Sequence, residues 1–325
     1  MPVWFNTNFL SSLTSSNFID SVNIYYNIFN WHLTITINRS NMILANANIK
    51  MGDDCMSDRD SCPSNDGCEK ENNPMNNVKK VVGVMSGKGG VGKSTISVLL
   101  AKQLNKKGFK VGILDADITG PSVPRLLNLK NKRARAKYEN ILPVATEEGI
   151  EVMSLNLLIE NEEEPVIWRG PLIGNIVKQF WTDVLWGKLD YLIIDMPPGT
   201  GDVAITAMQS IPIDGIIMVS VPQDLVSMIV SKAVNMVNKM GVSILGIIEN
   251  MSYVKCPNCN KKIRIFNGEN THEFLKKMDL KFLGELPVVD SICNPLSSQD
   301  KNTNNSIDSI FNPIVENIIK SLKEE

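Results

Sequence analysis

The sequence predicts an α/β fold, a doubly wound and mostly parallel sheet flanked by helices. Short, uniformly apolar runs recur along the chain and alternate with longer amphipathic stretches. Strands that are apolar at every position are buried on both faces, and helices between them supply the crossovers that parallel strands need. In such a sheet, ligands bind at the carboxyl ends of the strands.

The predicted elements follow one another in an alternating order. Predicted strands are the apolar runs at residues 80–86, 111–114, 151–155, 191–194, 215–219, 244–248 and 282–286. Predicted helices, with apolar residues at helical spacing, are residues 94–105, 171–186, 203–210, 225–240 and 307–322.

The composition divides the chain into three parts. Residues 1–50 are rich in Asn, Ser, Ile and aromatics, and they lack the basic start and apolar core of a signal peptide. Residues 31–37 alternate like a strand, but the sequence indicates no partner strand. We interpret 1–50 as an extension outside the working fold, with Met51 as the expected start. Residues 51–77 form a predicted flexible arm with three cysteines, and 78–325 form the folded domain.

The overall composition excludes several classes of partner. The chain is 43% hydrophobic and 21% charged, with a net charge of −2. Nucleic-acid binders usually carry a basic face, and a transmembrane helix needs an apolar run of about 18 residues or more. We therefore expect neither a nucleic acid nor a membrane as partner. Cysteines without a secretory signal indicate metal or redox work in a cytoplasmic protein.

A Gly-rich segment between the first predicted strand and helix predicts a nucleotide site. Gly87-Lys88-Gly89-Gly90-Val91-Gly92-Lys93-Ser94 matches the pattern G-x-x-x-x-G-K-[ST]. The glycines let backbone N–H groups turn towards phosphate oxygens, and the helix N-terminus adds its dipole. Lys93 is expected to contact the β- and γ-phosphates of ATP and Ser94 to bind Mg²⁺. The alternative is a Gly-rich turn that binds nothing.

Acidic residues follow two of the other predicted strands. Asp195 ends the run 191–194, which is the Walker B arrangement for holding Mg²⁺ through water. Residues 197–202 then form a predicted loop that senses the γ-phosphate. Asp115 and Asp117 follow the run 111–114. Asp115 could equally be a turn or helix-capping residue.

Lys88 resembles the second lysine of the deviant Walker A loop in the MinD/ParA/nitrogenase-iron-protein class of P-loop NTPases. The resemblance implies an ATP-dependent, face-to-face homodimer in which Lys88 contacts the phosphates of the opposite subunit. It also implies that Asp117 orients the attacking water and that Asn250 recognises adenine. The alternatives are a solvated loop lysine and an ordinary turn asparagine. The implied catalytic residues are Lys88, Lys93, Asp117 and Asp195, and the nucleotide-binding residues are Gly87, Lys88, Gly89, Gly90, Val91, Gly92, Lys93, Ser94, Thr95 and Asn250.

Longer motifs narrow the resemblance to one branch. The stretches GKGGVGKST, LDADITGPSVPR, VIWRGP, LDYLIIDMPPGTGD, VSVPQD, GIIENMSYVKCPNC and LGELP together resemble the Mrp/ApbC family, from about residue 77 to 296. WRGP and ENMSY…CPNC are not general P-loop features. The resemblance implies a cytoplasmic ATPase that holds a labile [4Fe–4S] cluster at its homodimer interface and transfers it to apo iron–sulfur proteins.

The metal chemistry centres on Cys256 and Cys259, in an insertion near residues 251–268. A C-x-x-C turn directs two thiolates at one metal centre. A two-fold axis through a dimer would supply four, which suit [4Fe–4S] or Zn²⁺. The resemblance favours the cluster. The alternatives are a structural zinc and a redox dithiol.

The other cysteines point to no single role. Residues 62–68 resemble the end of a ferredoxin-like motif in eukaryotic scaffold relatives, but the C-x-x-C step of that motif is missing and Cys55 is spaced differently. Cys55, Cys62 and Cys68 either assist cluster loading or belong to an inert polar arm. Cys293 is expected to be a buried apolar residue of a helix.

A competing interpretation is a MinD/ParA-like positioning ATPase, which binds a membrane or DNA, with a structural zinc at the C-x-x-C. The predicted C-terminal helix discriminates between the two. A membrane-surface helix carries many Lys and Arg on its polar face. This helix instead carries a net acidic set: Asp308, Glu316, Lys320, Lys323, Glu324 and Glu325. We therefore expect it to dock on the protein's own sheet.

Overall fold

The computed structural model divides the chain into two compact units, Met1–Gly67 and Cys68–Glu325. In the first unit it describes the backbone of residues 21–28, 31–38 and 43–48. In the second it describes residues 72–324, apart from 119, 138–139, 160–169, 223, 257, 260, 265–270 and 289–300.

The first unit contains a three-stranded antiparallel sheet of β1 (Ser21–Ile28), β2 (Trp31–Asn38) and β3 (Ile43–Asn48). The expectation that residues 31–37 lack a partner strand is wrong, because β2 pairs with both β1 and β3. Antiparallel strands need only short connections, so the neighbouring segments β1 and β3 can pair with β2 although the sequence pattern did not indicate them as strands. That residues 1–50 lie outside the working fold stays a prediction.

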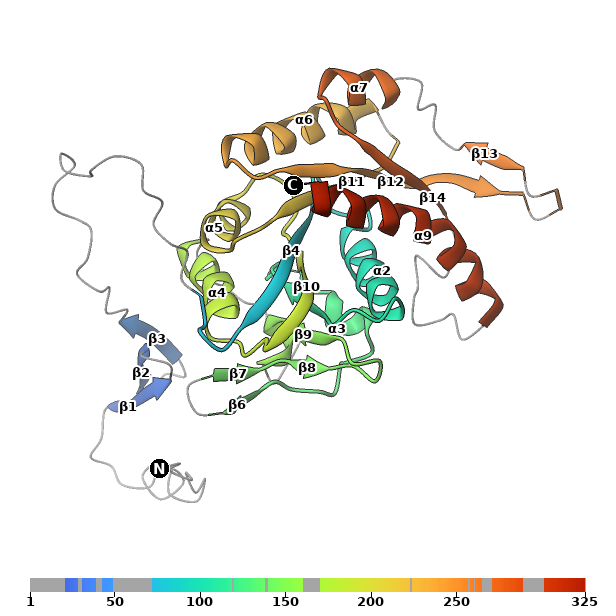
Figure 1. Ribbon diagram of the computed structural model, residues 1–325. Helices are drawn as coiled ribbons and strands as arrows, with labels where there is room; N and C mark the ends of the chain where they lie inside the picture. The colour runs from blue at the N-terminus through green and yellow to red at the C-terminus, as the bar shows by residue number, and fades with distance from the viewer. Residues whose placement is uncertain are drawn as a thin grey trace. The chain divides into compact units, whose positions relative to one another are not determined.

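The second unit is built on a nine-stranded sheet in the order β13-β12-β11-β4-β10-β5-β9-β8, with β14 beside β12 (Figure 1). Its strands are β4 (Asn77–Ser86), β5 (Val111–Asp115), β8 (Val144–Ala145), β9 (Glu151–Met153), β10 (Lys188–Asp195), β11 (Gly215–Ser220), β12 (Ile244–Lys255), β13 (Lys262–Arg264) and β14 (Phe282–Pro287). The pairings are parallel except those of β8 and β13. The predicted doubly wound, mostly parallel sheet is confirmed.

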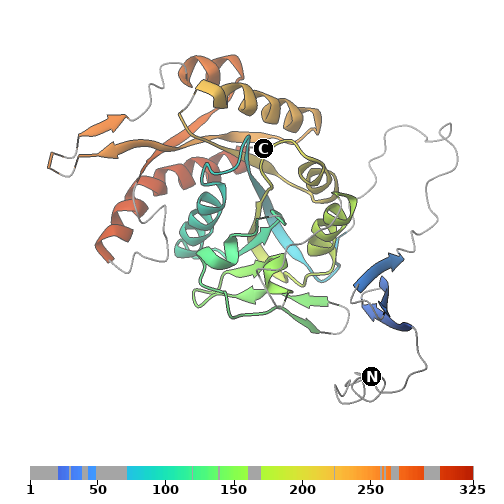
Figure 2. The same ribbon diagram turned by 180° about the vertical axis from the view of Figure 1, so that it is seen from behind.

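Helices cover both faces of this sheet. α2 (Lys93–Lys106) and α9 (Lys301–Glu324) lie on one face, and α4 (Gly170–Thr182), α5 (Asp202–Ser210) and α6 (Asp224–Lys239) on the other (Figures 1 and 2). Smaller elements connect them: α3 (Val123–Leu126), the 3₁₀ turn Leu155–Leu157, α7 (Thr271–Lys277) and a ribbon of β6 (Arg135–Lys137) and β7 (Asn140–Leu142).

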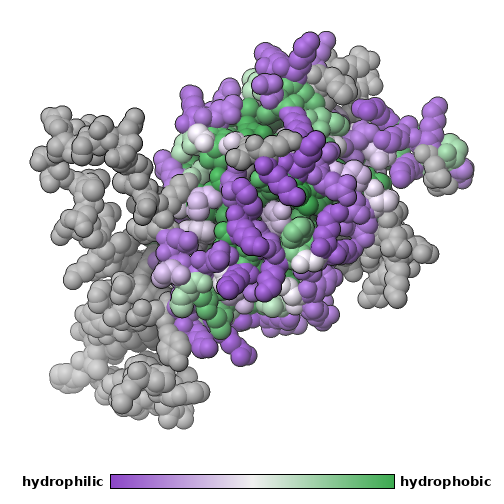
Figure 3. All heavy atoms as spheres, viewed as in Figure 1, coloured by the Kyte–Doolittle hydropathy of each residue, from purple (hydrophilic) through white to green (hydrophobic). Residues whose placement is uncertain are grey.

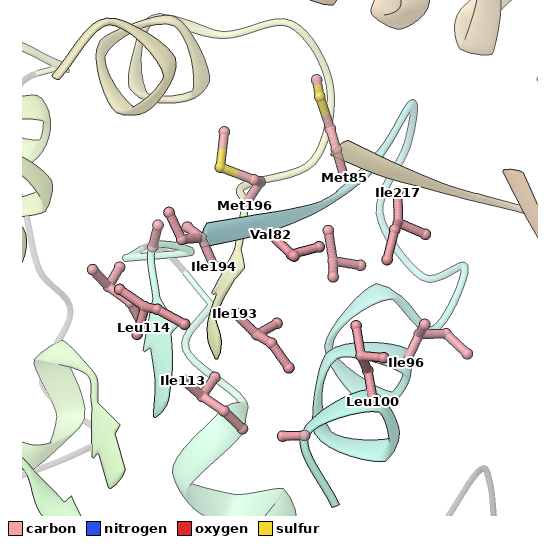
Figure 4. Packing of buried hydrophobic residues seen from close by; sticks show 14 of the residues in the cluster. Val82, Met85, Ile96, Leu100, Ile113, Leu114, Ile193, Ile194, Met196 and Ile217 are labelled. Carbon is pink, nitrogen blue, oxygen red and sulfur yellow. The ribbon is translucent and has the colours of Figure 1, made fainter. Parts of the chain in front are cut away.

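The core lies between the sheet and its helices. Ile96 and Leu100 of α2 point at apolar side chains of the central strands, among them Ile113 and Ile193 (Figure 4). All four side chains are fully buried. Burying such a side chain stabilises the fold by about 1.5–3 kcal/mol. Packing of the apolar runs therefore brings the carboxyl ends of the strands together at one edge of the sheet.

Several element boundaries differ from the prediction. β4 and β10 begin three residues before the predicted starts, and α9 begins six residues before its predicted start. The third predicted strand stops at Met153, because Leu155 begins the 3₁₀ turn. α4 stops at Thr182 rather than residue 186, because Trp186 packs into the core and its Nε1 donates to the Phe180 carbonyl at 3.0 Å. β12 continues to Lys255, well beyond the predicted end at residue 248. The additional strands β6, β7, β8 and β13 are short and not uniformly apolar, so periodicity did not indicate them.

The folded domain includes the last residues of the predicted arm. Asn76 is buried; its Nδ2 donates to the Val184 carbonyl at 2.9 Å, and its Oδ1 accepts from the Gly187 amide at 3.0 Å. A side-chain amide can satisfy one backbone donor and one acceptor in this way. Asn76 therefore ties the start of β4 to the turn before β10.

α9 docks on the protein's own sheet, as expected from its acidic polar face. Phe311, Ile314 and Ile318 are buried in the shared core, and Asp308 pairs with Lys106 of α2 at 2.7 Å. No helix in the described part of the chain is both long and apolar enough to cross a membrane.

Candidate nucleotide and metal-thiolate site

The Gly-rich loop connects β4 to α2, as predicted. Gly90 and Gly92 have φ angles of 79° and 85°, in the left-handed region that glycine adopts readily. At Gly92 a Cβ would lie only 2.3 Å from Asn250 Nδ2, so glycine is required there on both grounds. The first turn of α2 has no acidic residue and no side-chain cap. Its N–H groups can therefore serve an anion.

Lys93 lies in the centre of the site with its ammonium group buried. Its side chain is 6% exposed, and its Nζ lies 2.9 Å from Asp195 Oδ1 and 3.7 Å from Asp117 Oδ2. A buried charge needs such partners. The structure thus brings together three of the predicted catalytic residues.

Asp195 contacts Lys93 and two serine hydroxyl groups. It is fully buried at the end of β10. Ser94 Oγ donates to its Oδ2 at 2.5 Å, and Ser97 Oγ donates to its Oδ1 at 2.8 Å. The adjacent Ser94 and Asp195 oxygens are the hard ligands that Mg²⁺ prefers, directly or through water. Sequence reasoning missed Ser97; its position one helical turn after Lys93 was the available signal.

Asp115 has the contacts of a turn-stabilising residue. It is fully buried. Its Oδ2 accepts from Ser154 Oγ at 3.1 Å and from the Val123 amide at 3.3 Å, and its Oδ1 accepts from the Asp117 amide at 3.3 Å. Burial, followed by repulsion from Asp195, raises the pKa of Asp115 well above its usual value. These contacts position the loop that carries Asp117.

The charges around Lys93 favour a divalent cation. One ammonium group lies among the carboxyl groups of Asp117 and Asp195, and Asp115 is the register partner of Asp195 on the adjacent strand β5. Such an acidic centre repels nucleotide phosphates unless a cation accompanies them. The residues present therefore fit Mg·ATP better than free ATP.

The loop at residues 197–202 packs against the start of the Gly-rich loop, and its role in sensing the γ-phosphate stays a prediction. The Gly199 amide donates to the Ser86 carbonyl at 2.8 Å, and a Cβ at Gly199 would lie 3.7 Å from the Gly87 carbonyl oxygen. Lys88 is half-buried, and its carbonyl accepts from Ser86 Oγ at 2.9 Å. Gly89 and Gly90 next to it are exposed. The tip of the loop is thus open to solvent.

Asn250 lies beside the Gly-rich loop. It is 1% exposed, and its Nδ2 donates to the Val91 carbonyl at 2.9 Å. Its Oδ1 is buried without a hydrogen-bond partner among the described residues. An unused buried acceptor is costly, and it fits a ligand that brings a donor, as the amino group of adenine does.

Cys256 and Cys259 lie in the turn between β12 and β13. The Cys256 amide donates to the Lys261 carbonyl at 3.0 Å, which closes the turn. Cys256 is half-buried and Cys259 is exposed. The backbone N–H groups of Asn258 and Cys259, then the Cys259 side chain, lower the pKa of the Cys256 thiol. Such N–H groups favour a thiolate, the form that binds metals.

The turn supplies two metal ligands per chain. In the described part of the chain, no group of three or more His, Cys, Asp or Glu side chains could hold a metal ion. The remaining ligands of a four-thiolate centre have to come from elsewhere. Cys55, Cys62, Cys68 and Cys293, and also Trp168 and Arg169 of the WRGP motif, lie outside the described residues.

The lowered pKa of Cys256 has a direct consequence for its reactivity. A depressed pKa means that the thiolate is already present at pH values where an ordinary thiol is protonated. Alkylation of Cys256 by iodoacetamide in the reduced, metal-free protein should therefore reach its half-maximal rate at a lower pH than in an unfolded peptide of residues 250–264. Peptide-resolved mass spectrometry over pH 5–10 measures both curves, and coincident curves would contradict the described turn.

Comparison with known proteins identifies the family that this chain resembles. Residues 77–323 match the ParA family, described as NUBPL iron-transfer P-loop NTPase. An iron–sulfur cluster carrier protein of Clostridium perfringens is 52% identical over 219 residues, 65% of this chain and 77% of that protein. A carrier of the same description from Methanococcus maripaludis is 38% identical over 288 residues, 83% of this chain and all of that protein.

Two solved structures are also similar to this chain. A nucleotide-binding protein of Archaeoglobus fulgidus in complex with ADP is 41% identical, with a TM-score of 0.59 over 66% of this chain and 84% of that one. The cell division ATPase MinD of Pyrococcus furiosus, 18% identical with a TM-score of 0.53 over 74% of this chain and 98% of that one, shares the fold. The resemblance to iron–sulfur cluster carriers is thus confirmed, and the chain belongs to the ParA-type P-loop NTPases of the NUBPL iron-transfer family.

Proposed function

We propose that this protein is an ATP-hydrolysing carrier that holds a labile [4Fe–4S] cluster between two copies of the chain and transfers it to apo iron–sulfur proteins. The observation that carries the proposal is the turn of Cys256 and Cys259. It offers two thiols, one of them with a lowered pKa, directly after the strand that also contacts the nucleotide loop through Asn250.

The cluster is the cargo, and its ligand requirement argues for two copies. A [4Fe–4S] cluster takes four thiolates, and one turn supplies two. A two-fold axis beside the exposed Cys259 would complete the set from a homodimer. A centre shared by two subunits is released when the subunits move apart, which suits a carrier. The reducing cytoplasm expected from the sequence keeps such thiols available.

The nucleotide chemistry is assigned to residues around Lys93. Lys93 and the amides of the Gly-rich loop neutralise the phosphates, and Ser94 and Asp195 hold Mg²⁺. Lys88 contacts the phosphates bound by the opposite subunit, and Asn250 accepts from adenine. Asp117 orients a water whose oxygen bonds to the γ-phosphorus as the bond to the bridging oxygen breaks, leaving ADP and phosphate. Positioning and charge neutralisation suffice for this step.

Anaerobic reconstitution with iron and sulfide tests the proposal. The wild-type protein should develop a broad absorption near 400 nm and take up about four iron and four sulfide per dimer. The Cys256→Ala, Cys259→Ala double variant should take up neither beyond background. A Cys293→Ala variant is the matched control and should behave like the wild type.

Two outcomes would contradict the proposal. Equal iron uptake by the double variant would place the cluster elsewhere. About one tightly held zinc per dimer, with no iron uptake, would make the turn a structural zinc site. A positioning ATPase of the MinD type would then be the better description.

A further inference from the structure

The turn that carries the cysteines is held by one carboxylate on a neighbouring strand. Glu285 of β14 has its Oε1 2.6 Å from Lys262 Nζ and its Oε2 3.3 Å from Arg264 Nη2. Both basic residues belong to β13, which has three residues and buries none of their side chains. A strand without buried side chains gains little from packing. Glu285 therefore does much to fix the position of the hairpin.

The hairpin reaches beyond the body of the domain. β13 and the end of β12 project past the other strands (Figure 1), and this projection is largely hydrophilic on the face shown in Figure 3. Besides the backbone pairing of β13 with the end of β12, Lys262 anchors the hairpin, with its Nζ 4.4 Å from the ring centre of the buried Tyr253. Cation–π contacts of this kind are weak at exposed sites. An exposed hairpin with so few anchors is easily shifted.

The same carboxylate is connected to the interior of the domain. Ser252 Oγ lies 3.0 Å from Glu285 Oε2 and 2.8 Å from Glu249 Oε2. Ser252 and Glu249 are buried, with 1% and 5% exposure. A hydroxyl group has one proton and donates it to one acceptor at a time. Ser252 can thus serve either Glu249 or Glu285, and these are two discrete arrangements.

This connection begins at the nucleotide loop. Asn250, between Glu249 and Ser252 in sequence, donates to the Val91 carbonyl of the Gly-rich loop. Met251 has a φ of 54°, an uncommon conformation for a residue other than glycine. The pairing of β12 with β14 shifts register across the same segment, between Glu249 and Tyr253. The bend lies where β12 passes from the nucleotide loop to the cysteine hairpin.

We propose that Glu285 is a positioning residue for the Cys256–Cys259 turn, and that Asn250, Ser252 and Glu285 transmit the nucleotide state of the Gly-rich loop to that turn. When a nucleotide moves the Val91 carbonyl or engages Asn250 Oδ1, the bend at Met251 shifts. The Ser252 hydroxyl then donates its hydrogen bond to the other carboxylate. The ion pairs of Glu285 with Lys262 and Arg264 change as a result. The inference rests on the proposed function only in that the thiols hold a cluster.

Coupling of this kind requires that nucleotide binds the two arrangements with different affinity. The coupling can be measured as an effect of nucleotide on the reactivity of the Cys256 and Cys259 thiols, without any cluster. In the reduced, metal-free, full-length protein, the rate of iodoacetamide alkylation of the peptide containing Cys256 and Cys259 is followed with and without Mg·ADP. We expect ADP to change the wild-type rate by about fivefold or more.

Two variants test the connection at different points. Glu285→Gln should alkylate faster than the wild type and show the same rate with and without Mg·ADP. Ser252→Ala should show the same alkylation rate with and without Mg·ADP, because no hydroxyl remains to exchange between Glu249 and Glu285. In both variants the affinity for Mg·ADP, measured by calorimetry, should stay within about twofold of wild type.

Glu316→Gln is the matched control. Glu316 lies on α9, and its Oε1 is 3.2 Å from Lys107 Nζ at the surface. The substitution removes this ion pair, and the alkylation rate of the variant should match that of the wild type with and without Mg·ADP. A wild-type response to ADP that persists in Glu285→Gln would overturn the proposal, as would a wild-type rate that ADP leaves unchanged. Because no iron is present, failure here is distinct from failure of the reconstitution that tests the carrier function.

Discussion

Replacing Lys93 with Met should abolish nucleotide binding and also destabilise the fold. Affinity for Mg·ATP should fall by about 100-fold or more, because a buried cation facing the phosphates is lost. The free energy of unfolding should fall by about 3–5 kcal/mol, because Asp195 keeps its buried charge and loses the Lys93 ammonium at 2.9 Å. Calorimetry with Mg·ATP and urea denaturation measure the two effects.

A second substitution separates the two effects of Lys93. The Lys93→Met, Asp195→Asn double variant removes the fully buried carboxylate of Asp195 and leaves only Asp117 without the Lys93 ammonium, so part of the stability should return while nucleotide binding stays absent. The control Lys79→Met removes an exposed ion pair between Lys79 Nζ and Asp190 Oδ1, which are 2.7 Å apart, and its urea denaturation curve should stay close to that of the wild type. Wild-type ATP affinity in Lys93→Met would refute the assigned role of the Gly-rich loop.

Mixing two inactive variants should restore ATP hydrolysis if Lys88 acts across a dimer. Lys88→Ala and Ser94→Ala should each be inactive alone, because every site lacks one required group. In a mixed dimer, one site combines Ser94 of one subunit with Lys88 of the other and is complete. Random pairing makes about half of the dimers mixed, and each mixed dimer has one active site and one inactive site. About one quarter of the wild-type activity should therefore return.

The control for this experiment pairs two residues that act within one subunit. Lys93→Ala and Ser94→Ala damage both sites of a mixed dimer, so their mixture should stay inactive. Subunit exchange is verified with two affinity tags and sequential purification. If mixed dimers of Lys88→Ala and Ser94→Ala form but stay inactive, Lys88 serves its own subunit or none.

The sequence by itself was enough for the sheet, the Gly-rich loop and the cysteine turn. Uniformly apolar runs such as residues 191–194 are buried on both faces in any fold that accommodates them. The pattern from Gly87 to Ser94 dictates a local backbone conformation, because glycines provide the left-handed angles seen at Gly90 and Gly92. The side chains of Lys93, Ser94 and Asp195 meet because parallel strands end at one edge of the sheet.

Tertiary structure decided which distant polar groups share a proton or a charge. No periodicity indicates that Ser97 bonds Asp195 or that Ser154 supports Asp115, since such contacts depend on the packing of separate elements. The same holds for Asn76, which joins the predicted arm to the core, and for Glu285, which holds the hairpin from another strand. Apolar burial is a property of a segment, whereas a hydrogen bond depends on two atoms within about 3 Å of each other, and only the folded chain determines that distance.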